Sequence, residues 1–377
     1  MVDSSTPVPD SPREWQAQVD LLGLSTQTIH SIQLKSASRG SREQFLLLRV
    51  LWKDHTSSEF LRFFNLNQWL PVAKDKLGNL SSWRKYYQSF TSPIPEGTFA
   101  PARHYQLEVS KTEQRDFGSG VVFTPKVHLT RSRTQAAQLP IRQPDFTSTT
   151  PLRKPNQAFE TPCVDDEADT SPLGFSASPP SHWSTINPDD EFMYPPTKDE
   201  QIVNTALLVF LDSITLHFDL PVSWSLHRMA LTAEFTNAKF EARTDGYLAD
   251  CDGDIKAIIE VKPVLRQTKE PQIRIQESHQ IVAGLLTDLK SSLPARRNKP
   301  TDAADGSRII ISQDRQEIHI SVAEYNADYI NYLQTGDIRN NPFMVIHQFG
   351  PWNTNSAAAM SELGPILLAI SLNAQHY

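Results

Sequence analysis

Three charged residues, Asp245, Glu260 and Lys262, have the types and the spacing that a metal-dependent hydrolytic site requires. They lie in the stretch FEARTDGYLADCDGDIKAIIEVKP, residues 240–263, whose pattern predicts two β-strands joined by a tight turn. Asp252-Gly253 favours a two-residue type I′ turn, because that turn needs positive φ at both central positions. The sequence therefore predicts a hairpin with charged residues on both strands.

The register of this hairpin decides which charges meet. With the turn centred on Asp252-Gly253, Cys251 faces Asp254 and Asp245 lies directly opposite Glu260. Cβ atoms of directly opposed residues are about 4.5–5.5 Å apart, so the two carboxylates can hold one divalent cation. Lys262 projects to the same face because strand side chains alternate with period 2. Opposed like charges are destabilising, and a metal ion or a proton would relieve them.

This layout suits the hydrolysis of a phosphodiester. The reaction places negative charge on phosphoryl oxygens, and one or two Mg²⁺ ions neutralise it and lower the pKa of a bound water. Mg²⁺ prefers oxygen ligands, so the expected ligands are Asp245, Glu260 and the backbone carbonyl of Val261. Lys262 is expected to orient or activate the water, or to stabilise charge in the transition state.

The elements around the hairpin predict a mixed α/β domain with one central sheet. A helix is expected to start near Thr197, which forms a capping-box pattern with Glu200. The segment 275–289 predicts a second amphipathic helix that carries Gln276, Glu277 and Gln280. Further elements are expected as follows: two strands within 308–325, a helix at 328–333, a strand at 343–349 and a helix at 357–371.

The remainder of the chain is expected to fall into three parts. Residues 1–40 are predicted to be a flexible N-terminus with a short helix from Arg13 to Leu22, and residues 41–90 a small helical element. Residues 91–195 are expected to be a disordered linker rich in Pro, Ser and Thr, with a short strand in 117–129. Residues 196–377 are expected to form the domain that carries the site.

Charge and cysteine content limit the function class. The net charge is −7, and residues 197–377 contain 16 Lys+Arg and 22 Asp+Glu, which argues against nucleic-acid binding driven by overall charge. The two cysteines, Cys163 and Cys251, form neither a disulfide framework nor a zinc site. No signal peptide or membrane-spanning stretch is recognisable, so the chain is expected in the nucleus or cytoplasm and not at a membrane.

RTDGYL, the AIIEVKP strand fifteen residues later and the helix IQESHQIVAGLL resemble the PD-(D/E)xK nuclease superfamily, and more narrowly the nuclease-like domains of fungal proteins. The resemblance covers about 196–372. It implies a restriction-endonuclease-like core with the hairpin at the centre of the sheet, helices on both faces, and Mg²⁺ or Mn²⁺ as cofactor. Asp245 matches the first-strand acid, Glu260 and Lys262 the (D/E)xK pair, Gln280 the helix glutamine, and Glu200 an acid at the first helix. The proline of the motif is absent, since Thr244 precedes Asp245.

Each of these residues also has a structural interpretation. Glu200 can simply be the capping partner of Thr197. Gln276, Glu277 and Gln280 can form a solvated helix face, and Lys262 can be an edge charge that discourages aggregation.

The leading hypothesis is a divalent-metal-dependent nuclease whose partner is nucleic acid, DNA rather than RNA. The competing hypothesis is an inactive nuclease-fold domain that serves as a binding or interaction module. The sequence leaves open whether cleavage is endo- or exonucleolytic, and also the oligomeric state.

Overall fold

The computed structural model describes residues 6–111, 200–291 and 305–374. The described helices are α1 (Pro12–Leu21), η1 (Ala37–Arg39), α2 (Arg42–Leu47), η2 (Ser57–Glu59), α3 (Phe60–Phe63), α4 (Trp69–Asn79), α5 (Ser81–Gln88), α6 (Ala100–Ser110), α9 (Glu200–Thr215), α10 (Arg266–Ser291), α11 (Ala327–Thr335) and α12 (Ala357–Asn373). The described strands are β1 (Val50–His55), β2 (Val222–Ser225), β3 (Ala230–Glu234), β4 (Lys239–Arg243), β5 (Gly246–Asp250), β6 (Ile255–Lys262), β7 (Asp305–Asp314), β8 (Glu317–Asn326) and β9 (Met344–Asn353).

Seven strands form one mixed sheet in the order β1-β9-β8-β7-β6-β5-β2. β1 runs parallel to β9 and β6 runs parallel to β7, while the other neighbours are antiparallel. β3 and β4 form a separate two-stranded sheet. The expected α/β class with a central mixed sheet is confirmed. The β5–β6 hairpin, however, lies toward one end of the sheet and not at its centre.

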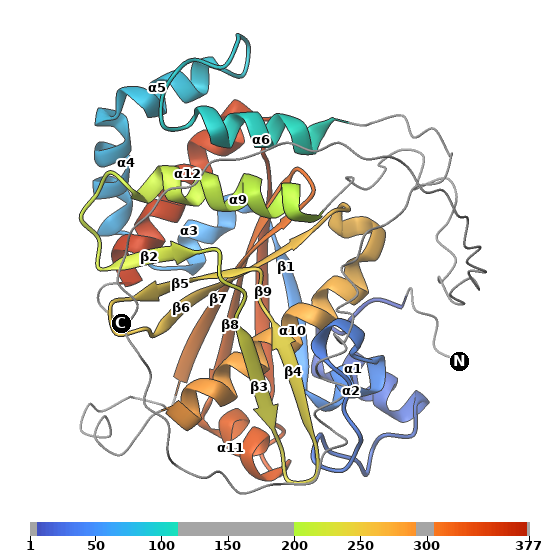
Figure 1. Cartoon of the computed structure of the whole chain (residues 1–377). Coiled ribbons are helices and arrows are strands. Elements are labelled where there is room, and N and C mark those ends of the chain that lie inside the picture. The colour runs from blue at the N-terminus through green and yellow to red at the C-terminus, as the bar shows by residue number, and fades with distance from the viewer. Residues whose placement is uncertain (1–5, 112–199, 292–304, 375–377) are drawn as a thin grey trace, which may run out of the picture. The chain divides into compact units, whose positions relative to one another are not determined.

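Helices cover both faces of this sheet (Figure 1). Because successive strand residues point to opposite faces, Ile258 and Ile259 of β6 belong to two different hydrophobic clusters. Ile259 packs in the cluster that contains buried residues of α4, α6, α9 and α12. Ile258 packs in the cluster of α1, α2, α10 and α11. Glu260 and Lys262 share the parity of Ile258 and therefore face α10.

The turn of the β5–β6 hairpin is wider than the predicted type I′ turn. Gly253 has φ +85°, but Asp252 has no positive φ, and the register shifts between Leu248 and Ala249. The Asp250 carboxylate closes the turn by accepting hydrogen bonds from the backbone N–H groups of Asp252 at 3.0 Å and Asp254 at 2.8 Å. An aspartate that binds its own turn stabilises a wider loop, so the expected pairing of Cys251 with Asp254 is wrong.

The N-terminal residues 6–40 are part of the fold, contrary to the flexible terminus expected from their composition. Trp15 and Val19 of α1 are buried, and Trp15 Nε1 donates a hydrogen bond to the carbonyl of Leu46 at 2.8 Å. The predicted short helix at Arg13–Leu22 corresponds to α1. The burial of Trp15 against α2 therefore orders a segment whose sequence is mostly polar.

Residues 41–90 contain the strand β1 as well as helices, whereas a small helical element was expected. The helical pattern ends at Arg49, whose φ of +55° breaks α2 from β1. The Arg49 guanidinium lies 4.2 Å from the Trp15 ring centroid and 4.4 Å from that of Phe343, and its Nε donates to Pro342 O at 2.7 Å. The apolar run that follows is buried as β1 against β9, a pairing almost 300 residues distant in sequence.

Part of the predicted linker is folded. α6 lies within 91–195, yet Ala102, Gln106 and Val109 are buried and the helix packs against α9. Residues 112–195 of that segment, with the strand expected in 117–129, lie outside the described residues. Thr197 also lies outside them, and so does its predicted capping box. No helix in the described ranges has the length and apolar character of a membrane span.

Trp52 tests whether β1 is integral to the domain. Its side chain is 1% exposed and Nε1 donates to Ser278 Oγ of α10 at 3.0 Å. Trp52→Ala is expected to lower the free energy of unfolding by about 3–5 kcal/mol, because it leaves a cavity between sheet and helix. Leu21→Ala is the matched control, since Leu21 is 72% exposed and should change stability by less than about 0.5 kcal/mol. Chemical unfolding measures both; equal effects would contradict an integral β1.

Candidate active site

The β5–β6 pairing brings the two predicted carboxylates together. Gly246 pairs with Ile259, so the next residues outward, Asp245 and Glu260, stand opposite one another. The backbone N–H of Asp245 donates to the carbonyl of Ile259 at 3.0 Å, which holds the two strands in register at this point. The predicted opposition of Asp245 and Glu260 is thus present, although the turn that was used to derive it has a different form.

Three contacts fix Asp245, which is 6% exposed. Its Oδ2 accepts a hydrogen bond from the backbone N–H of Val261 at 3.1 Å. Asn204 of α9 donates from Nδ2 to the carbonyl oxygen of Asp245 at 3.3 Å. Its Oδ1 lies 3.1 Å from Nη2 of Arg228. One carboxylate oxygen is therefore engaged with the backbone, and the other faces a side-chain cation.

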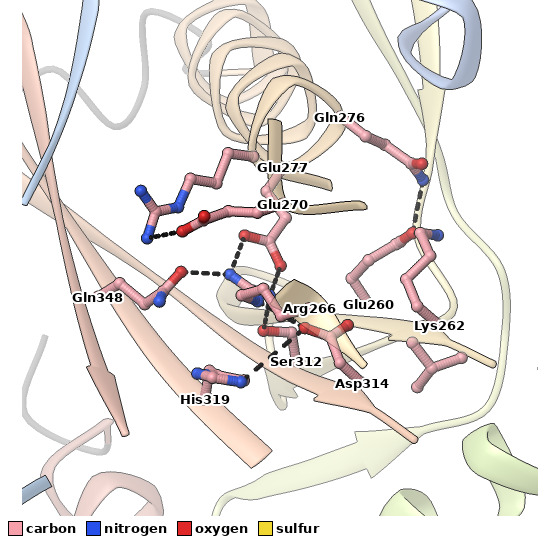
Figure 2. A network of polar contacts seen from close by, with 12 residues as sticks. Glu260, Lys262, Arg266, Glu270, Gln276, Glu277, Ser312, Asp314, His319 and Gln348 are labelled. Carbon is pink, nitrogen blue, oxygen red and sulfur yellow. Dashed lines mark hydrogen bonds and ion pairs between the residues drawn. The ribbon is translucent and has the colours of Figure 1, made fainter. Parts of the chain in front are cut away.

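Glu260 is 2% exposed, and both of its carboxylate oxygens accept hydrogen bonds. Oε1 accepts from Lys262 Nζ and from Gln276 Nε2, the latter at 2.5 Å, and Oε2 accepts from Gln280 Nε2 at 2.5 Å. Figure 2 shows Gln276 reaching from α10 to Glu260 beside Lys262. Burial raises the pKa of Glu260 to about 7; Lys262 opposes that rise and the Asp245 charge adds to it.

Lys262 completes the charged cluster. Burial alone would lower its pKa, but the charges of Glu260, Glu200 and Asp245 raise it. Glu200, the first residue of α9, is thus close enough to act electrostatically on Lys262. Because β6 lies between β5 and β7 and the Lys262 side chain is only 16% exposed, the interpretation of Lys262 as an edge charge is wrong.

The helix glutamines are part of the site rather than a solvated face. Glu277 and Gln280 are fully buried, and Gln276 is partly buried. Gln280 Nε2 also donates to the carbonyl of Arg243 at 2.9 Å, which orients its amide toward Glu260. Gln276 and Gln280 are four residues apart and therefore lie on one face of α10.

A second buried network adjoins the cluster (Figure 2). Arg266, 3% exposed, forms ion pairs at 2.5 Å with Glu277 and with Asp314 of β7. It also donates to Ser312 Oγ at 2.8 Å and to Gln348 Oε1 of β9 at 2.5 Å. Burial raises the pKa of Asp314 to about 6 although Arg266 opposes that rise. This network binds the start of α10 to the sheet and so positions the helix glutamines.

Sequence reasoning missed four residues of this region, Asn204, Arg228, Arg266 and Asp314. Asn204 lies in α9, Arg228 in the loop between β2 and β3, Asp314 at the end of β7 and Arg266 at the start of α10, and tertiary packing sets the partner of each. A buried position within an apolar helical stripe was the only signal for Asn204, and the other three gave none.

The side chains offer oxygen donors of the kind that Mg²⁺ or Mn²⁺ prefers. They are the carboxylates of Asp245 and Glu260, joined by Gln280 Oε1, which is buried and accepts no hydrogen bond. Within the described ranges, no group of three or more His, Cys, Asp and Glu side chains is arranged to hold a metal. The donor set suits a hard cation, and Lys262 or Gln276 must release Glu260 Oε1 for that atom to serve as a ligand.

Comparison with known proteins does not assign the chain to a family. No protein-family model matches it, and no curated protein is significantly similar to it.

The raised pKa of Glu260 predicts a pH-dependent stability. An acid whose folded pKa lies near 7, above its ordinary 4.5, stabilises the fold below about pH 4.5 and loses that contribution as pH rises through 7. Relative to Glu260→Gln, the free energy of unfolding of the wild type should therefore fall by up to about 3 kcal/mol between pH 5 and pH 8. Urea unfolding at both pH values in chelator measures the difference. Glu241→Gln, at an exposed carboxylate, should show no such pH-dependent difference from the wild type. A difference in unfolding free energy between wild type and Glu260→Gln that is the same at both pH values would contradict the expectation.

Proposed function

We propose that this protein is a divalent-metal-dependent nuclease that hydrolyses phosphodiester bonds of nucleic acid, with DNA as the first substrate to test. The observation that carries the proposal is the opposition of Asp245 and Glu260 on paired strands, with Lys262 bonded to Glu260. Two converging carboxylates can hold a divalent cation, and a lysine beside them can stabilise the charge that develops on the phosphoryl oxygens.

The roles of the side chains follow from their positions. Asp245, through Oδ1, and Glu260 would hold a Mg²⁺ or Mn²⁺ ion, together with the carbonyl of Val261. When bound, that ion would neutralise phosphoryl charge and lower the pKa of a water molecule. Lys262 would orient the attacking water or stabilise developing charge. Gln280 holds Glu260 in place, and Glu200 helps to keep Lys262 protonated.

The arrangement of elements supports a restriction-endonuclease-like core for this proposal. α9 precedes the hairpin and contributes Glu200 and Asn204, and α10 follows it and contributes the glutamines. A hairpin that carries the charged residues and helices on both faces (Figure 1) agree with the layout that the motif implies, whereas the hairpin's place toward one end of the sheet does not.

One observation favours a second candidate, a nuclease-fold module that binds a partner without cleaving it. Glu260 is 2% exposed, and three side chains occupy its two oxygens. A cation could reach Oε1 of Glu260 only by displacing Lys262 or Gln276. In such a module, the acidic site would be a structural remnant.

Substitution of the three charged residues tests the proposal. Asp245→Asn, Glu260→Gln and Lys262→Ala should each reduce cleavage of plasmid DNA or of labelled RNA in Mn²⁺ or Mg²⁺ by at least about 100-fold, because each removes a ligand or the charge-stabilising group. Gel-resolved cleavage rates measure the effect, and circular dichroism verifies the fold.

Glu241→Gln is the matched control, because this carboxylate lies near the hairpin but is exposed and paired with Arg243. It should leave the rate unchanged. Calorimetric titration with Mn²⁺ separates the two candidates: binding that disappears in Glu260→Gln supports the nuclease. Cleavage that persists in all three variants would contradict the proposal. A wild type that binds DNA, does not bind Mn²⁺ and does not cleave DNA favours the binding module.

A further inference from the structure

The unshared oxygen of Asp245 is paired with an arginine from outside the predicted motif. Oδ2 is engaged with the Val261 N–H, and Oδ1 lies 3.1 Å from Arg228 Nη2. The Arg228 side chain is 55% exposed while that of Asp245 is 9% exposed. Any cation that Asp245 binds through Oδ1 therefore competes with the Arg228 guanidinium.

The loop that carries Arg228 is fixed next to Asp245. It connects β2 to β3, and Met229 forms two hydrogen bonds with Thr244, the residue before Asp245. The Met229 N–H donates to Thr244 Oγ1 at 3.2 Å, and the Thr244 N–H donates to the carbonyl of Met229 at 3.1 Å. Proline has neither a hydroxyl nor an N–H, so the motif's usual proline could form neither bond. Thr244, which stands where the motif has proline, therefore holds the loop so that Arg228 lies beside Asp245.

The charges of the site explain how Arg228 can change partner. When all three acids are ionised, Asp245, Glu260 and Glu200 carry three negative charges, against two positive charges on Lys262 and Arg228. A divalent cation on Asp245 and Glu260 would turn this small negative excess into a positive one. The guanidinium would then be repelled from Oδ1 toward an anion. Only the Arg228 side of this pair is exposed, and the cation would replace the guanidinium as the partner of the buried Asp245 carboxylate, so the exchange would not leave that charge unpaired.

We propose that Arg228 is a phosphate-binding residue that exchanges between Asp245 and the scissile phosphate when a divalent cation binds. The inference rests on the proposed nuclease function and specifies how that site binds its substrate. Arginine suits this role, because its guanidinium binds carboxylate and phosphate with the same planar geometry.

The exchange predicts effects of opposite sign on metal and on DNA. Arg228→Gln removes the competing charge, so Mn²⁺ should bind about two- to fivefold more tightly by calorimetry. The same variant should bind a labelled DNA duplex more weakly in Mn²⁺. The slope of log affinity against log salt should fall by about one, as expected for one lost phosphate contact. DNA binding is measured by fluorescence anisotropy in a Lys262→Met background to prevent cleavage.

Arg243→Gln is the control for a general loss of charge near the site. Arg243 lies two residues before Asp245, but its side chain is 71% exposed and pairs with Glu241. It should leave the Mn²⁺ affinity unchanged. Equal changes in Mn²⁺ affinity for Arg228→Gln and Arg243→Gln would overturn the exchange.

The outcomes also separate this inference from the proposed function. A wild type that binds Mn²⁺ through Glu260, with an Arg228→Gln variant that binds metal and DNA as the wild type does, overturns the role of Arg228 alone. A wild type that binds no Mn²⁺ overturns both. Tighter Mn²⁺ binding together with weaker DNA binding in Arg228→Gln supports the exchange.

Discussion

The burial of the Glu260 carboxylate is the constraint on which the surrounding structure depends. An isolated buried charge is strongly unfavourable, and here a second carboxylate, Asp245, stands opposite it. Compensation comes from Lys262 on the same strand and from Gln276 and Gln280 on α10. The glutamines reach Glu260 only if α10 lies closely across the sheet. The position of that helix is therefore tied to the satisfaction of one acidic side chain.

The same requirement extends across the sheet and accounts for the role of the N-terminal segment. On the face toward α10, Glu260 pairs with Ser312, Ser312 with His319, and Ser321 with Gln348. Arg266 connects β7, β9 and α10 within this polar layer. The layer ends at β1, where Gln348 donates to Asp54 Oδ1 at 3.2 Å. Without β1, the end of a buried polar network would be exposed, so residues distant in sequence from the site support it.

The sequence allowed the hairpin, its charged face and the following helices to be predicted, because alternation and short-range register are local properties. The opposition of Asp245 and Glu260 survives the misjudged turn because the register shift between Leu248 and Ala249 offsets the wider turn by one residue and restores the expected pairing. The strand at Val50–His55 could not be predicted, since three buried apolar residues fit helix or strand until β9 is present. The roles of Arg228 and Arg266 could not be predicted either, because a sequence does not distinguish an exposed arginine from a buried one.

The polar layer is itself an argument for function. Buried ion pairs are often no better for stability than well-packed apolar residues of similar volume. Stability alone would therefore not favour a layer of polar and charged side chains that crosses five adjacent strands. Opposed carboxylates also break the local rule for cross-strand pairs, and such violations are expected at functional sites. Thr244 also points to a function, since its two hydrogen bonds with Met229 hold the exposed Arg228 beside Asp245. A scaffold that only needed to fold would have no use for that arrangement, whereas a site that exchanges cations on Asp245 would.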